Sequence, residues 1–425
     1  MPDQIFSGVV RGNMITRCPL KNLAFYLLST ILLPSGVLAQ NAVFTVQKTP
    51  SPNMRGNTLN AVAAVSGTDA WAVGYQNDNN LNDSRSLTQH WNGSSWAMVK
   101  SPNPGTTQQC QGGNTGNVLN AVAAVGSNDV WAVGFSFSCT SLLKPMAIHW
   151  NGSQWSVVST PKLNTNDNAA FNGIVAFASN NVYAVGYQPA TNGAGLTLVE
   201  HWDGSAWTVV PTPNGNSTGN VLLSVSASSP SDIWAVGDEV APNVEVRTLA
   251  LHFDGVAWSV VPTPNPVGGS SLDQNVLTSI VSDGPNNATA VGFTLANLTE
   301  LTMAQHWDGT SWKVVPTPNK SSAQGAFNTL RGITAVNATD LYAVGFFANS
   351  STGGNQAAMI MHFNGTRWTF VRNQPKGIAQ QLNGVFALPG TTDVWVSGAA
   401  STNGTDPESG LLQIPLTLTL FSPGA

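Results

Sequence analysis

One motif recurs seven times along this chain of 425 residues, and it limits the possible folds more than any other feature. Its first two copies read LNAVAAVSGTDAWAVG and LNAVAAVGSNDVWAVG, so apolar and small residues alternate as in β-strands. The copies begin at Leu59, Leu119, Phe171, Leu222, Leu277, Leu330 and Leu382. Such a long period with only strand-like content is typical of the repeats that form propeller blades.

Six copies are followed by a second phrase that the seventh lacks, as in HWDGSAWTVVPTPN from His201. The segment FTVQKTPSPN, which begins at Phe44, supplies this ending before the first copy starts. Residues 44–47 align one by one with residues 207–210, so one unit is divided between the two ends of the chain. A ring of repeats closes in this way and loses two open sheet edges. Residues 416–420 also alternate, and they either extend the third strand of the last unit or compete for its outer place.

Each unit divides into four expected strands, which in the first unit are residues 59–65, 70–74, 87–91 and 96–99. Asn92-Gly93 joins the last two strands, and we expect a tight hairpin with positive φ at both residues. The prolines that follow cannot donate to a ladder. The sequence therefore predicts an all-β, seven-bladed β-propeller of four-stranded antiparallel blades over residues 40–425, closed by strand 44–47.

The N-terminal 39 residues have the pattern of a signal peptide: basic residues, an apolar run over residues 23–33, and small residues before Gln40. An uncleaved anchor is the alternative, and Met14 is an alternative start. No later segment has the apolar length of a membrane helix. We therefore expect a secreted, periplasmic or cell-surface monomer.

Charge and motif content limit the classes of partner. Only 9% of residues are charged, the net charge is −5, and no run of lysine or arginine occurs, which argues against nucleic acid as a partner. No phosphate loop, dinucleotide fingerprint or nucleophile elbow is present, so we expect no cofactor.

Most of the chemically versatile side chains occupy fixed positions of the repeat. This holds for all six histidines, His90, His149, His201, His252, His306 and His362, with Ile414 expected at their position in the seventh unit. One histidine per blade cannot converge on an ion at the ligand distance of about 2.1 Å, so we expect hydrogen bonds within blades and no metal site. The 14 tryptophans are expected to pack between blades. Repeat aspartates such as Asp69 are expected to bond the backbone amides of a turn.

Only two joints of the unit vary in length: the joint between the second and third strands and the joint between units. Both emerge on one face of an up-and-down blade, and variable loops on a fixed scaffold often carry function. We call this the variable-loop face; its segments between second and third strands are residues 75–86, 135–144, 187–194, 238–247, 293–300, 346–355 and 399–409. Cys110 and Cys139 both fall there, and the even cysteine count of an exported chain favours a disulfide over two free thiols.

The repeat resembles those of bacterial exported propellers of the broad kelch-like and sialidase-like group. The WAVG strand followed by a D-G-T-S-W hairpin, Asp308 to Trp312, also looks like the photosystem-assembly propellers. The sialidase-type Asp-box reads S-x-D-x-G-x-T-W, whereas Asp and Gly are adjacent here. The resemblance implies a propeller fold, and fold alone carries no function.

Asp238, Glu239 and Glu245, with Arg247 nearby, form the densest charged group on the variable-loop face, and solvated loop charges are the alternative interpretation. We expect this group to bind a protein or glycan ligand without catalysis, because the loops offer few groups that titrate near neutral pH. A carbohydrate-active enzyme, hydrolase or lyase, is the first alternative, since a glycosidase needs only two carboxylates about 5–9.5 Å apart. A structural envelope or matrix protein is the second.

Overall fold

The computed structural model describes residues 44–52, 56–77, 83–107, 115–139, 142–163, 168–190, 193–214, 217–242, 244–349, 356–371, 380–401 and 413–420. Within these ranges the chain is all-β, with one short 3-10 turn, η1 (Pro104–Thr107), and no α-helix. The predicted signal peptide lies outside the described residues.

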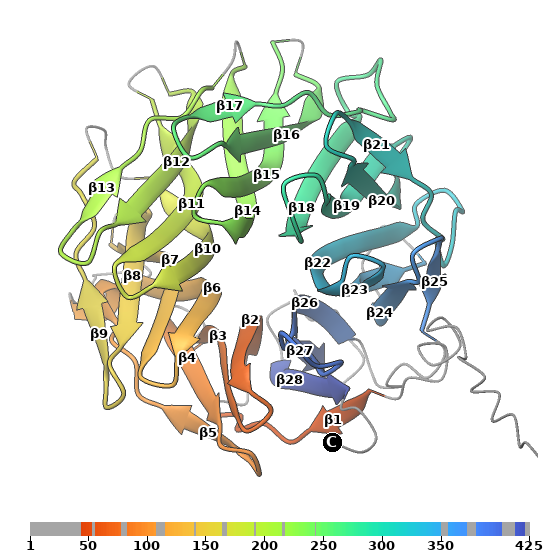
Figure 1. Cartoon of the computed structure of the whole chain (residues 1–425). Coiled ribbons are helices and arrows are strands. Elements are labelled where there is room, and N and C mark those ends of the chain that lie inside the picture. Colours follow the sequence, from red (N-terminus) through yellow and green to blue (C-terminus); the bar gives the residue numbers. More distant parts are fainter. Residues whose placement is uncertain are drawn as a thin grey trace, which may run out of the picture. The chain divides into compact units, whose positions relative to one another are not determined.

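Each repeat forms four antiparallel strands that lie side by side in sequence order (Figure 1). Units 1 to 3 comprise β2 (Asn57–Ser66), β3 (Asp69–Asn77), β4 (Ser84–Trp91) and β5 (Trp96–Val99); β6 (Thr115–Gly126), β7 (Asp129–Ser138), β8 (Lys144–Trp150) and β9 (Trp155–Val158); and β10 (Ala170–Ala178), β11 (Asn181–Pro189), β12 (Gly195–Trp202) and β13 (Trp207–Val209). Units 4 to 6 comprise β14 (Gly219–Ser229), β15 (Asp232–Val240), β16 (Val246–Phe253) and β17 (Trp258–Val260); β18 (Gln274–Ser282), β19 (Ala288–Ala296), β20 (Thr299–Trp307) and β21 (Trp312–Val315); and β22 (Phe327–Asn337), β23 (Asp340–Ala348), β24 (Ala357–Phe363) and β25 (Trp368–Phe370).

The seventh sheet combines both ends of the described chain. Its strands are β26 (Gln380–Ala387), β27 (Val394–Ser401), β28 (Gln413–Leu420) and β1 (Thr45–Gln47), in that order. β1 runs antiparallel to β28, with Val46 opposite Leu418. β28 continues through Pro415 as the third strand, so residues 416–420 extend that strand and leave the outer place to β1.

The first strands of successive units contact one another. β2 contacts β6, the pattern continues through β10, β14, β18, β22 and β26, and β26 contacts β2. Between units 4 and 5 a single parallel pair, Val246 with Gln274, also joins two sheets into one of eight strands.

A β-bulge recurs in every first strand and explains the glycine that ends each A-V-G motif. In unit 1 the pairing shifts between Leu59 and Ala61, which leaves Asn60 as the extra residue. A Cβ atom on the facing Gly74 would lie 1.9 Å from the carbonyl oxygen of Thr58. The equivalent glycines of the other six units meet a carbonyl oxygen at 1.9 to 2.1 Å, so only glycine fits beside the bulge.

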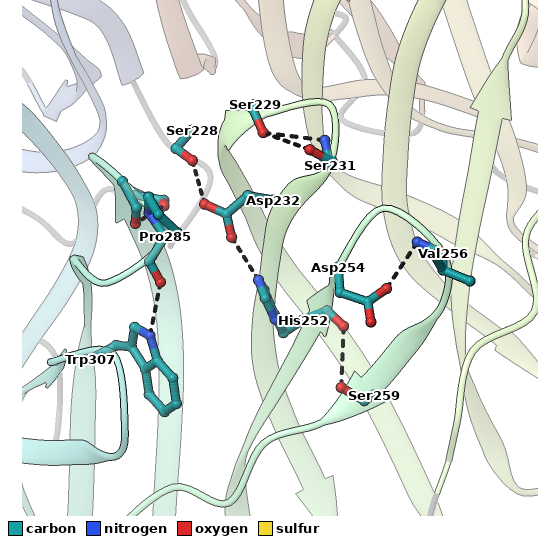
Figure 2. Close-up of polar contacts among 12 residues, drawn as sticks. Ser228, Ser229, Ser231, Asp232, His252, Asp254, Val256, Ser259, Pro285 and Trp307 are labelled. Carbon is teal, nitrogen blue, oxygen red and sulfur yellow. Dashed lines mark hydrogen bonds and ion pairs between the residues drawn. The ribbon is translucent and has the colours of Figure 1, made fainter.

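Histidine joins the third strand to the start of the second, which confirms hydrogen bonds within units. His90 Nε2 lies 2.8 Å from Asp69 Oδ1, and four of the other histidines make the same contact with aspartate or asparagine. In Figure 2, Asp232 bonds His252 through one oxygen, while Ser228 donates to the other. The expectation that these aspartates bond turn amides was therefore wrong, because their carboxylates face the imidazole across the sheet.

The position expected for Ile414 in the seventh unit also needs correction. His90 lies opposite Trp71 in the strand register, and the residue opposite the equivalent Trp395 is Thr419. The reason is that β28 extends to Leu420, so the third strand lies five residues further along the sequence than expected.

Aromatic side chains pack between units, as predicted. Trp155 of unit 2 meets Trp71 of unit 1 edge to face, with ring centroids 5.1 Å apart. Trp96 of unit 1 meets Trp395 of unit 7 at 5.8 Å. Phe44 precedes β1 and packs on a tyrosine of unit 6, so it takes the place of the fourth-strand tryptophan in the seventh unit. These contacts bury the largest side chains of the core.

The hairpin between the third and fourth strands is wider than predicted. Trp91 pairs with Trp96, so four residues form the loop. The Oδ1 atom of Asn92 accepts from the amides of Ser94 and Ser95, both at 3.0 Å, and only Gly93 has positive φ, at 92°. The asparagine therefore acts through its side chain as an Asx turn, which the two-residue hairpin did not anticipate.

Candidate functional site: a polar cavity lined by the first strands

A cavity of about 260 Å³ lies between the first strands, and every unit contributes to its wall. Each contributes the bulge residue and the two residues that follow it. The bulge residues are Asn60, Asn120, Asn172, Leu223, Thr278, Arg331 and Asn383. A bulge redirects a side chain out of the regular alternation, and in six units the redirected side chain bonds the next unit.

The asparagines at the bulge tie each unit to the next. Asn60 Nδ2 donates to the carbonyl oxygen of Leu119 at 2.9 Å, and Asn383 Nδ2 donates to that of Leu59 at 3.1 Å. Asn120 and Asn172 make the same bond to the following unit, at 2.8 and 2.9 Å. Four units therefore share one polar connection around the cavity.

Three consecutive units depart from asparagine. Thr278 preserves the connection, because its Oγ1 donates to the carbonyl oxygen of Leu330 at 2.7 Å. Leu223 has no group that can donate, and units 4 and 5 are joined instead by the amide of Ile280, which donates to Ser224 Oγ at 3.3 Å. The cavity wall is therefore chemically uneven: amides line units 7, 1, 2 and 3, and other groups line units 4 to 6.

Arg331 is the third departure and the one charged side chain among the cavity-lining residues. Its Nη1 donates to Asn383 Oδ1 at 3.2 Å, and its Cζ lies 5.0 Å from the ring centroid of Phe346. The side-chain oxygen of Gln381, with its amide oriented to satisfy both groups, accepts from Nη1 and Nη2. Stacking and hydrogen bonds thus fix the guanidinium in one orientation.

The four residues singled out from the sequence do not line this cavity. Asp238 and Glu239 lie in the last part of β15, which ends at Val240, and Arg247 is the second residue of β16, so three of them lie on strands rather than loops. Arg247 faces Glu239 in the register and bonds Glu245, with Nη2 2.7 Å from Oε2. The charges are therefore partly matched among themselves.

Asp238 differs from its neighbours electrostatically. Burial raises the pKa of its carboxyl to about 6, because the ionised form loses hydration. A carboxyl with this pKa is partly protonated near neutral pH.

The cavity residues lie on the first strands, away from the variable loops in which a site was expected. A signal was present: the second residue of each motif is asparagine in four units and leucine, threonine or arginine in the others. Comparing the residue at one position in all seven repeats shows which residue types the fold accepts there.

Other predictions concern cofactors and cysteines. Among the described residues, no group of three or more His, Cys, Asp or Glu side chains is placed to hold a metal ion. The described ranges also contain no helix with the length and apolar character needed to cross a bilayer. Cys139 directly follows β7, the second strand of unit 2, whereas Cys110 lies outside the described residues, so their pairing stays a prediction.

Comparisons with known proteins identify the fold. No protein-family model matches the chain, and no curated protein is detectably similar in sequence. Among solved structures, YCF48 bound to a D1 peptide superposes with a TM-score of 0.50 at 12% identity, over 90% of this chain and 96% of that one. A polysaccharide lyase of family PL25, an ulvan lyase, superposes with a TM-score of 0.53 at 8% identity, over 84% and 93%. The structural neighbours are β-propeller proteins, so this chain has a propeller-like fold of four-stranded antiparallel sheets.

Proposed function

We propose that the chain is an exported, closed seven-bladed propeller that binds a glycan in its central cavity without chemical turnover. Seven units of four strands and the cycle of contacts between first strands support the ring. The pairing of β1 with β28 supports its closure through the N-terminal strand. The predicted signal peptide supports export. A protein ligand is the other outcome that the proposal tests.

The observation that carries this proposal is the polar cavity to which every unit contributes. Its amide and hydroxyl groups both donate and accept hydrogen bonds, which suits the many hydroxyls of a sugar. Asp238, Glu239, Glu245 and Arg247 supply a second polar surface on unit 4, which contacts ligand outside the cavity in this proposal.

A glycan array with the purified mature protein tests the function, with chromogenic glycosides assayed in parallel. Asn172→Leu is the informative variant, because unit 4 already carries leucine at this position and its sheet forms. We expect weaker binding by this variant and unchanged folding. The matched control is Arg367→Gln, which changes an exposed hairpin residue outside the cavity. Array binding that Asn172→Leu leaves intact would contradict a ligand site in the cavity.

One observation favours a second function, a carbohydrate-active enzyme. A pKa of about 6 suits Asp238 to the role of a general acid, which a glycosidase needs. If the purified protein hydrolyses or cleaves a polysaccharide and Asp238→Asn abolishes turnover, the enzyme replaces the binding protein as the function. Binding without turnover in the same preparations supports the first proposal.

A further inference from the structure

We propose that Arg331 makes the cavity a site for a sugar acid, a uronate residue whose carboxylate pairs with the guanidinium. This inference rests on the proposed glycan-binding function and names the ligand class. Arg331 gives the cavity wall a positive charge, because the other side chains that line it are apolar, amide or hydroxyl groups. A guanidinium matches a carboxylate through two parallel hydrogen bonds, which neutral amides cannot do with the same strength.

The scaffold does not require arginine at this position. Four units have asparagine there and one has threonine, and each of these makes the cross-unit bond to a backbone carbonyl. An asparagine in unit 6 would be enough to make the same hydrogen bond to the next unit. A long charged side chain that contacts Asn383 instead therefore adds a chemical property that the structural connection does not need.

The guanidinium is held in place before any ligand arrives. Phe346 packs against it, while Asn383 and Gln381 accept from its N–H groups. Such fixation lowers the entropy that a ligand must overcome on binding, because the arginine side chain is already ordered. It also orients the planar fork, which is the part of arginine that recognises a carboxylate.

The groups around Arg331 fit the rest of a sugar acid. Thr278 and Ser279 of unit 5 line the same cavity, as does Asn383 of unit 7. These units flank unit 6 on its two sides, so hydroxyl and amide groups stand on both sides of the charge. A simple anion would use the guanidinium alone, whereas a uronate would use the flanking groups as well.

The test compares sodium D-glucuronate, D-glucose and sodium acetate by ligand-observed NMR with the full-length mature protein. We expect glucuronate to bind more tightly than either of the others. Arg331→Asn should weaken glucuronate binding about tenfold or more, because a charge-assisted hydrogen bond is lost. This variant restores the residue found in four other units, so it should fold, and its melting temperature checks that. Arg331→Lys keeps the charge without the fork and should bind with intermediate affinity.

The control is again Arg367→Gln, which removes one positive charge from an exposed hairpin. Glucuronate affinity that Arg331→Asn leaves unchanged, or that acetate or glucose equals, would overturn the inference. If the glycan array shows binding but the wild type and Arg331→Asn bind glycans that contain uronate equally well, the proposed function stands and the sugar-acid assignment fails. If the wild-type protein binds no glycan and no glucuronate, both fail.

Discussion

Glu200 is fully buried on β12, and neither carboxylate oxygen has a hydrogen-bond partner among the described residues. Burial raises the pKa of this carboxyl to about 8. Glutamine occupies the equivalent position in two other units. Gln89 Nε2 donates to the carbonyl oxygen of Pro50 at 2.8 Å, and Gln305 Nε2 donates to that of Pro264 at 2.9 Å. We therefore predict that Glu200→Gln stabilises the protein above pH 5.

The magnitude follows from the two pKa values. The unfolded carboxyl keeps its ordinary pKa of 4.5, so between pH 4.5 and about 8 the unfolded chain is ionised while the folded one retains the proton. Each pH unit in this window lowers the free energy of unfolding by about 1.4 kcal/mol. The contribution of this carboxyl to the free energy of unfolding is fully present below pH 4.5. It falls as the pH rises and no longer changes above about pH 8. At pH 7 the accumulated loss is about 3 kcal/mol.

The assay is equilibrium unfolding in urea at pH 5 and pH 8, for the wild type and Glu200→Gln. The difference between the two proteins should grow by about 3 kcal/mol over this range, in favour of the variant. The reciprocal variant, Gln305→Glu, should introduce the same pH dependence into unit 5. A stability difference that does not change between pH 5 and pH 8 would refute the buried, protonated carboxyl.

Three further predictions concern the scaffold. Gly74→Ala should lower the melting temperature strongly, because its Cβ would overlap a carbonyl oxygen, whereas Gly126→Ala, which meets nothing within 4 Å, should have little effect. Deleting residues 44–47 should lower the melting temperature and increase light scattering, because it exposes the edge of β28; an unchanged melting curve would contradict the role of β1. Peptide mass mapping without reductant should show Cys110 joined to Cys139, a link worth about 3–4 kcal/mol by chain entropy, and free thiols at both positions would exclude it.

The repeat made strand order predictable, since alternation, turn residues and the divided seventh unit are all properties of local sequence. The hairpin at Asn92 was not predictable in the same way, because its geometry depends on a side-chain acceptor that competes with the backbone turn. The partners of the repeat aspartates were missed for a related reason: Asp69 and His90 are 21 residues apart and meet only across a formed sheet.

The candidate site shows a different limit of sequence reasoning. The predicted site was placed at Asp238 and its neighbours because charged residues can be recognised directly in a sequence. The cavity is built by residues that a β-bulge turns out of alternation, and bulges leave no consistent local signature. Comparison among the seven units would have identified Leu223, Thr278 and Arg331 as departures from asparagine, and Arg331 as the charged one.

The pairing of β1 with β28 sets the order of events during biosynthesis. β1 is synthesised before all the other described strands and β28 after them, so the seventh sheet cannot assemble until every repeat has been made. Pairing β1 with β28 joins segments that are far apart in the sequence, and the loss of chain entropy on joining them opposes this step. Until β1 pairs with it, β28 keeps an open edge that can pair with a strand of another chain.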